Sequence, residues 1–349
     1  MEDDVKKIYD TIKDYRNDDG IYITEDHIVE WAEQFGGDKE FIISELAHII
    51  PKVYVSKLTA KIFIKKHIDF IMQKNAYQSI QQFLMDVGFL NLQLPHKSQP
   101  AILSLLEEIL TVEYKESYLK YETFPKKIYI YFDDILATGS TIGRDIIKWL
   151  NEEDDKKIPN FENLLNDKFK LYINIFCCHS WGLSFLKFRL KKTFVDKIDT
   201  KISYFYNYEV QNHAKWNNQM LNVAFPIEEQ EQNVQAYLLG LGVDKYGDYA
   251  YRKTGTPKNE VFFSSPENRI RYENILLQKG LSIINMIQGS INPRIRPLGF
   301  INPNYKTFGL GTHFFTWRNV PNNSPLVFWW EVNGHNWKPL FSVANRGLQ

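Results

Sequence analysis

The chain has 349 residues, 44% hydrophobic and 24% charged, and its 42 basic and 42 acidic residues cancel. This composition is typical of a globular protein, and the length exceeds one average domain. A balanced charge excludes binding of nucleic acid through the field of the whole molecule. No apolar run in the sequence is long enough to span a bilayer, and the N-terminus has no signal-peptide pattern. The two cysteines, Cys177 and Cys178, are adjacent and cannot link distant parts of the chain by a disulfide. We therefore expect a cytoplasmic protein that makes no membrane contact.

The first 87 residues are predicted to be helical. Apolar residues recur at helical spacing in several segments, separated by turn residues. The predicted helices cover 26–35, 40–50, 58–72 and 75–87. We expect an N-terminal helical domain over residues 1–87, and a winged-helix-like unit is one form that it could take.

A stripe of lysines marks the third of these helices. Lys57, Lys61 and Lys65 are spaced four apart, so they share one helical face. A basic helix in a small helical domain can bind nucleic acid through its phosphates. The alternative is a solvated face, which is the commoner role of such a stripe. Nucleic acid is thus one candidate partner.

Strands alternate with helices between residues 88 and 225. The predicted strands are 89–94, 127–132, 169–178 and 200–210, and the predicted helices are 98–110, 141–150 and 181–192. This order predicts an α/β core over 88–225 with a doubly wound, mainly parallel sheet. Sheets of this kind bind ligands at the carboxyl ends of their strands.

Residues 226–349 show a mixed pattern. A long helix is predicted over 268–287, and the tail is rich in aromatic residues. Four of the eight tryptophans lie there: Trp317, Trp329, Trp330 and Trp337. We expect a helical and aromatic-rich C-terminal subdomain that covers the site of the core.

Two adjacent carboxylates follow the strand at 127–132. Asp133 and Asp134 come where this strand is expected to leave the sheet, so both could project into a crevice. Two carboxylates can accept hydrogen bonds from a vicinal diol such as that of a ribose. The pair therefore predicts a site for a ligand with neighbouring hydroxyl groups.

A turn of small residues comes next and opens a predicted helix. Its members are Ala137, Thr138, Gly139, Ser140 and Thr141. Backbone N–H groups, hydroxyls and the helix N-terminus all favour a phosphate there. The spacing suits a ribose 5-phosphate laid across the turn. The alternative is that Ser140 or Thr141 only caps the helix and the aspartates cap the loop.

The segment IYIYFDDILATGST resembles the PRPP-binding signature of type I phosphoribosyltransferases. That signature has an apolar strand, two acidic residues, three further residues and then Thr-Gly-x-Thr. The resemblance implies that Asp133 and Asp134 bind the ribose hydroxyls and that the turn from Ala137 to Thr141 binds the 5-phosphate. It also implies Mg²⁺ at the two aspartates, bridging the ribose and the pyrophosphate.

A second resemblance covers more of the chain. A helical N-terminus, the central DDxxxTGST and the Pro-Asn-Asn-Ser-Pro run before Trp329 are similar to phosphoribosyltransferase-like proteins of bacterial conflict systems. These are proposed antiphage effectors, some of them associated with retrons. The resemblance implies a role in antiviral defence, with a homo-oligomer or a partner from the defence system as further expectations.

The sequence departs from that family at the pyrophosphate-binding loop. The candidate upstream is LPHKSQPA, where Lys97 and Ser98 would be the donors, and it lacks the usual glycine. The alternative is an ordinary connection between a strand and a helix. His179 follows the strand at 169–178 and could act as an acid or base, although a structural histidine is the commoner case.

Two functions from different classes follow. The first is an enzyme that binds PRPP or a nucleotide with Mg²⁺ and transfers or removes a phosphoribosyl group, as a defence effector acting on nucleotide pools. The second is a catalytically degenerate sensor of a phosphoribosyl ligand, or a module that binds nucleic acid. A protein that only binds partners through its lysine helix and aromatic tail is a third reading.

Overall fold

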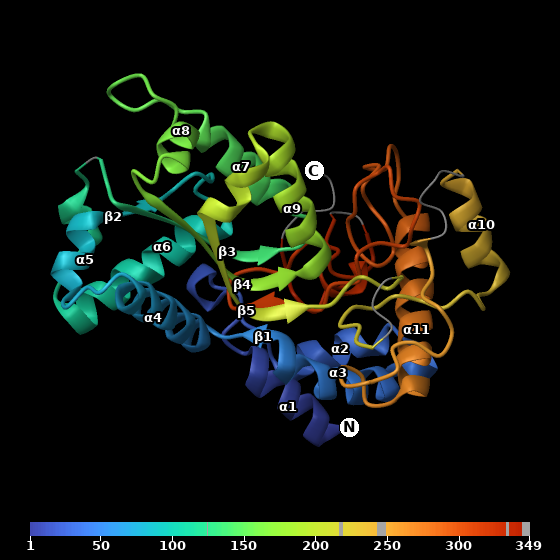
Figure 1. Ribbon diagram of the computed structural model, residues 1–349. Helices are drawn as coiled ribbons and strands as arrows, with labels where there is room; N and C mark the ends of the chain where they lie inside the picture. Colours follow the sequence, from blue (N-terminus) through green and yellow to red (C-terminus); the bar gives the residue numbers. More distant parts are fainter. Residues whose placement is uncertain (124, 216–218, 243–248, 333–334, 344–349) are drawn as a thin grey trace. The chain divides into compact units, whose positions relative to one another are not determined.

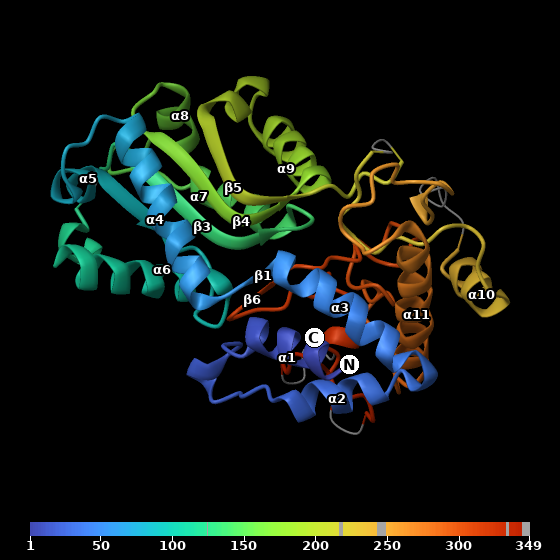
Figure 2. The same cartoon turned by 90° about the horizontal axis from the view of Figure 1, so that it is seen from below.

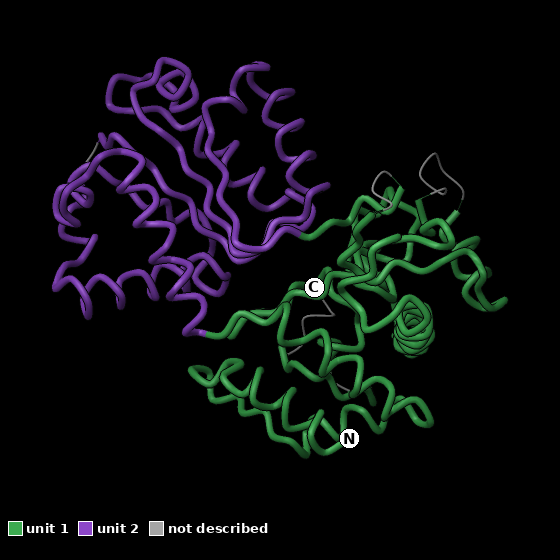
Figure 3. The backbone as a smooth tube through the Cα atoms, turned by 60° about the horizontal axis from the view of Figure 1, so that its bottom comes forward, with its two compact units in different colours: residues 1–56, 210–349 green, residues 57–209 purple. Residues whose placement is uncertain are grey.

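The computed structural model describes residues 1–123, 125–215, 219–242, 249–332 and 335–343. These residues form two compact units, shown in different colours in Figure 3. Unit 1 is built from residues 1–56 and 210–349, and unit 2 from residues 57–209.

The division into units differs from the expected boundaries at 87/88 and 225/226. The segment 57–87, expected in an N-terminal helical domain, belongs to unit 2. Its first helix packs on the sheet, where the ring of Phe63 lies 5.8 Å from that of Phe176. The first 56 residues instead share a core with the C-terminal part. Helical periodicity identified the helices, but it does not determine which partners they pack against.

Unit 2 is an α/β unit with a four-stranded sheet in the order β2-β3-β4-β5 (Figure 1). Its strands are β2 (Val87–Leu90), β3 (Ile128–Leu136), β4 (Lys170–His179) and β5 (Ile202–Val210). Its helices are α4 (Lys57–Lys74), α5 (Ile80–Asp86), α6 (Ser98–Ile109), α7 (Ser140–Leu150), α8 (Asn160–Leu165) and α9 (Ser180–Thr193). The pairs β2–β3 and β3–β4 are parallel, which confirms the predicted α/β class with a parallel sheet.

The central strands of unit 2 are apolar along nearly their whole length. Almost every residue of β3 and β4 is buried, as is typical of strands covered on both faces. Helix α4 lies on one face of the sheet, whereas α7 and α9 lie on the other (Figures 1 and 2). Parallel pairing brings the carboxyl ends of β2, β3 and β4 to one edge, with Leu90 opposite Tyr131 and Leu136 opposite Cys178.

The regular elements described in unit 1 are mainly helices, joined by long irregular segments. Its helices are α1 (Glu2–Ile12), α2 (Glu25–Glu33), α3 (Lys39–Val53), α10 (Gln232–Gly240) and α11 (Pro266–Asn285). The short strands β1 (Tyr54–Val55) and β6 (Phe315–Thr316) pair in parallel. The predicted long helix over 268–287 is confirmed as α11, which begins with Ser265 as its N-cap and Pro266 in its first turn.

The aromatic tail is part of the core of unit 1. Trp31 in α2 donates a hydrogen bond from Nε1 to the carbonyl of Val327 at 2.9 Å, and its ring stacks on Phe328 at 5.8 Å. Trp329 and Trp330 are fully buried in the same core. The N-terminal helices and the tail therefore fold together, and the expected cover of the tail over the core site stays a prediction.

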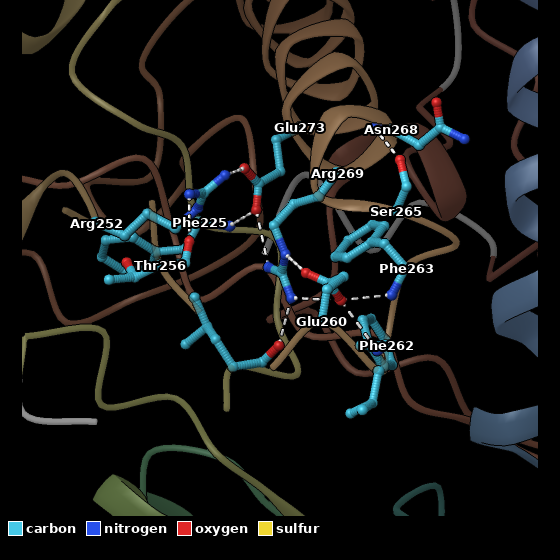
Figure 4. A network of polar contacts seen from close by, with 12 residues as sticks. Phe225, Arg252, Thr256, Glu260, Phe262, Phe263, Ser265, Asn268, Arg269 and Glu273 are labelled. Carbon is cyan, nitrogen blue, oxygen red and sulfur yellow. Dashed lines mark hydrogen bonds and ion pairs between the residues drawn. The ribbon is translucent and has the colours of Figure 1, made fainter. Parts of the chain in front are cut away.

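A buried ionic network anchors the irregular segments of unit 1 to α11 (Figure 4). Glu273 accepts from Arg252 at 2.8 Å and from Arg269 at 3.1 Å, and Arg269 also contacts Glu260. All four side chains are nearly inaccessible to solvent. Two cations against two anions leave no net buried charge, so the network can be accommodated in the core. Among the described helices, none has the length and apolar character needed to cross a bilayer.

Candidate functional site

The two predicted aspartates lie inside β3. The sequence had led us to expect both residues where this strand leaves the sheet. The strand instead continues to Leu136, so Asp133 and Asp134 lie within it. Both side chains are buried, with exposed fractions of 3% and 4%. Adjacent side chains of a strand alternate between its faces, so each carboxylate has surroundings of its own. The apolar run at the carboxyl end of β3 extends the strand past the acidic pair.

Asp133 lies at the centre of a hydrogen-bond cluster. Its Oδ1 accepts from the Ser98 hydroxyl at 2.7 Å and from the backbone N–H of Asp134 at 2.9 Å. Its Oδ2 accepts from Gln93 Nε2 at 2.8 Å and lies 3.3 Å from the Tyr131 hydroxyl. Burial and the charge of Asp134 raise the pKa of Asp133 to about 8, against the opposing effect of the Ser98 and Gln93 hydrogen bonds.

Tyr131 links this cluster to α7. Its hydroxyl lies 3.1 Å from Oδ2 of Asp145 and accepts from Gln93 Nε2 at 2.8 Å. Asp145 is buried and holds the exposed Arg144 guanidinium through Nε and Nη2, at 3.0 and 2.9 Å. The strand and the helix on either side of the turn are therefore joined by side-chain hydrogen bonds.

Asp134 lies near the following strand. Burial raises the pKa of the Cys177 thiol well above its usual value, and the charges of Cys178 and Asp134 add to this effect. Cys177 and Cys178 are buried residues of β4.

The small-residue turn connects β3 to α7. Gly139 occupies the N-cap position, so no side chain caps α7 there, and the Thr138 hydroxyl accepts from the backbone N–H of Ser140 at 3.3 Å. Ser140 and Thr141 are exposed in the first turn of the 11-residue helix. The simple capping role of Ser140 or Thr141 is therefore not what the structure shows. An exposed helix N-terminus with hydroxyls beside it has the chemistry of an anion site.

Gly139 is required by packing as well as by its conformation. Its φ of 71° lies in the left-handed region, and a Cβ there would come within 2.6 Å of the Gly182 carbonyl in α9. A Cβ on Gly182 would lie 2.1 Å from the carbonyl of Ala137. The turn is thus pressed against α9, and Arg189 of that helix donates to the Ser140 carbonyl at 3.3 Å. Contact with α9 holds the turn in one shape before any ligand arrives.

The two candidate residues of the upstream loop, Lys97 and Ser98, have different surroundings. β2 ends at Leu90 and α6 begins at Ser98, so residues 91–97 form an irregular connection. Ser98 reaches the acidic pair, as its hydrogen bond to Asp133 shows, whereas Lys97 is exposed. The backbone N–H groups of Leu92 and Gln93 donate to Gln99 Oε1 at 2.6 and 3.0 Å. The connection therefore contacts Asp133 through side chains.

Two other predicted features are not part of this cluster. On α4, Lys61 pairs with Glu108 at 2.6 Å and Lys65 pairs with Glu113, so the lysine stripe is partly neutralised within unit 2. His179, the last residue of β4, is fully buried, and burial lowers its pKa to about 3. A histidine in that environment stays neutral at physiological pH.

Sequence reasoning missed Gln93, Tyr131 and Asp145. Tyr131 stands two residues before Asp133 and so shares its face of the strand, which is a signal that could have been used. Asp145 lies among the buried residues of α7, next to Ile146, and an acid on an apolar face needs a partner. Gln93 had no sequence signal, because its contact depends on how the connection after β2 folds back.

Comparison with known proteins gives one extensive match. A family described as PRTase-CE, which is phosphoribosyltransferase-like, matches residues 28–343. No curated protein matches the chain. Among solved structures, the chain is similar to the AQ2163 protein from Aquifex aeolicus at 19% identity, over 36% of this chain and 56% of that one. The chain thus spans little more than half of that protein, and the TM-score of 0.21 does not establish a shared fold.

Proposed function

Because the chain belongs to the phosphoribosyltransferase-like PRTase-CE family, we propose that unit 2 binds PRPP or a nucleotide and transfers or removes its phosphoribosyl group. The observation that carries this proposal is the direct succession, in one segment, of two buried carboxylates and the exposed N-terminus of α7. The first suits the ribose hydroxyls and the second suits the 5-phosphate.

In this proposal, each part of the segment has a separate task. Asp133 and Asp134 orient the ribose by accepting from its 2′- and 3′-hydroxyls, which requires the end of β3 to turn so that both carboxylates face the ligand. Thr138, Ser140 and Thr141 surround the 5-phosphate with hydroxyls and backbone N–H groups. Cleavage at the anomeric carbon passes through an oxocarbenium-like state, so positioning and electrostatic stabilisation would supply most of the rate.

Magnesium fits the donor set of this segment. Mg²⁺ prefers one or two carboxylates together with the phosphate oxygens of a substrate. The described residues contain no cluster of three His, Cys, Asp or Glu side chains, which suits a cation held largely by its substrate. Asp133 and Asp134 would hold it, and it would neutralise charge on a departing pyrophosphate.

A ligand sensor without turnover is the second candidate, and one observation favours it. The N–H groups of Leu92 and Gln93, which a pyrophosphate-binding loop would offer to its ligand, are bound to Gln99. Turnover of a bound ligand separates the two candidates. The resemblance to conflict-system proteins supports a cytoplasmic defence role, antiphage and retron-associated, for either one.

The test is calorimetric titration of PRPP with Mg²⁺ into the wild type and into Asp133→Asn/Asp134→Asn. We expect the double variant to lose binding, because two amides replace the acceptors of the diol. The matched control is Asp3→Asn/Asp4→Asn, which makes the same chemical change in the first turn of α1 in unit 1 and should bind normally. Binding that the folded double variant retains at the strength of the wild type would contradict the proposal.

A further inference from the structure

We propose that Gln93 and Ser98 close the site in the ligand-free protein, and that a phosphoribosyl ligand reaches Asp133 only after these side chains release it. This inference rests on the proposed function and concerns the regulation of the same site. Its basis is the number of hydrogen bonds that Asp133 already receives.

The acceptor capacity of Asp133 is filled by the protein itself. A carboxylate offers about four lone-pair sites. Ser98 and the N–H of Asp134 occupy Oδ1, while Gln93 and Tyr131 contact Oδ2. A protonated carboxyl has fewer acceptor sites, so the conclusion holds in either state. With an exposed fraction of 3%, Asp133 also offers no surface to an incoming hydroxyl.

Two of the four contacts can leave without disturbing the sheet. The N–H of Asp134 is part of the β3 backbone, and Tyr131 is buried in the same strand. Gln93 belongs to the irregular connection, and Ser98 is the first residue of α6. Both are amide or hydroxyl donors, the same kind of group as the hydroxyls of a ribose. They occupy the positions that a diol would need.

Gln99 links the connection after β2 to β3 by hydrogen bonds. Its side chain is fully buried, accepts from the N–H groups of Leu92 and Gln93, and donates from Nε2 to the Phe132 carbonyl at 3.1 Å. The connection is thereby tied to the residue that precedes Asp133. The contacts of Gln93 with Asp133 and Tyr131 follow from this anchoring, which makes the closed arrangement the stable one without ligand.

The closure predicts that removing the competing donors improves binding. A hydrogen bond has a net strength that corresponds to about a 2- to 10-fold change in affinity when the acceptor is neutral, and to about a 10- to 100-fold change when it is charged. Gln93→Ala and Ser98→Ala should each tighten the binding of ribose 5-phosphate, and the double variant should bind tightest. Association should also become faster, because opening no longer precedes binding.

The experiment is titration of ribose 5-phosphate, and of PRPP with Mg²⁺, into the wild type, the two single variants and the double variant. Gln81→Ala and Ser104→Ala are matched controls on α5 and α6, where both side chains are exposed, and should bind as the wild type does. Thermal unfolding of each variant checks that it folds. If the double variant does not fold, either single variant is enough to test the closure.

The outcomes separate this inference from the proposed function. Tighter binding by the variants, or binding by the variants alone, supports the closure. Weaker binding would mean that Gln93 and Ser98 are donors to the ligand, and unchanged binding would mean that their contacts do not limit access; either result overturns the closure but leaves the proposed function intact. Absence of binding by every folded protein overturns both.

Discussion

Asp133 takes its side-chain hydrogen bonds from three places in the chain: the connection after β2, the start of α6 and its own strand. The sequence singled out this residue through the acidic pair and the turn behind it. It did not reveal that the side chain is enclosed, because Gln93 and Ser98 reach it only when the connection folds back over β3.

His313 allows a prediction about pH at the scale of one residue. It is buried in unit 1, where Nδ1 lies 3.0 Å from the Gly311 carbonyl and Nε2 lies 3.2 Å from the Tyr272 hydroxyl. Burial lowers its pKa to about 4. The unfolded chain binds a proton near pH 6.5, whereas the folded protein does not until about pH 4. The stability that neutral His313 contributes is therefore complete above pH 6.5 and falls as the pH drops toward 4.

The measurement is urea unfolding of the wild type and His313→Gln between pH 4 and 7. We expect the free energy of unfolding of the wild type to fall by up to about 1.4 kcal/mol for each pH unit of acidification over that range, because of this residue. The variant should be less stable at pH 7 but show a shallower slope. His96→Gln, at an exposed position, is the control and should keep the slope of the wild type. Equal slopes for the wild type and His313→Gln would refute the assignment.

Helix α4 shows how a single element combines apolar and polar packing. Its Phe63 contacts Phe176 at 5.8 Å, and its Phe70 contacts Phe205 at 4.6 Å. Between them, the ring of His67 lies 6.4 Å from that of Phe132 in β3. Asn174 is the residue of β4 that pairs with Phe132 in the sheet. Asn174 is fully buried, and within the described chain neither atom of its amide has a hydrogen-bond partner. A polar residue thus interrupts the apolar contact of α4 with the sheet.

Asn174→Leu is predicted to stabilise unit 2. A buried amide without partners costs about 1–3 kcal/mol, and leucine has a similar volume without that cost. We expect the free energy of unfolding to rise by about 1–2 kcal/mol in urea titrations. Asn160→Leu is the matched control, because Asn160 donates to the Trp149 carbonyl at 2.9 Å and its loss should destabilise. If Asn174→Leu also destabilises, the amide is satisfied by buried water.

At the scale of the whole molecule, unit 2 is a continuous stretch of chain inserted between the two parts of unit 1. Residues 57–209 contain the whole four-stranded sheet apart from the last residue of β5, and also the acidic pair and the turn. Unit 1 needs both of its segments, because β1 and β6 pair across them and Trp31 packs on Phe328.

We therefore predict that residues 57–210 fold when produced alone. The fragment should unfold cooperatively in urea, because its own core is complete. Residues 211–349 alone should not, since their core lacks the apolar faces of α1, α2 and α3. Circular dichroism during urea titration measures both. A fragment 57–210 that fails to unfold cooperatively would show that unit 2 depends on unit 1.

The sequence by itself determined the kinds of elements, the parallel α/β character of the centre and the acidic pair followed by the small-residue turn. These features are local: hydrophobic periodicity, a buried strand and a turn each depend on neighbouring residues. The tertiary structure decided which helices share a core, that β3 continues through both aspartates, and that Gln93 and Ser98 enclose Asp133. Those outcomes depend on contacts between residues far apart in the chain, such as Trp31 with Phe328, which no local pattern encodes.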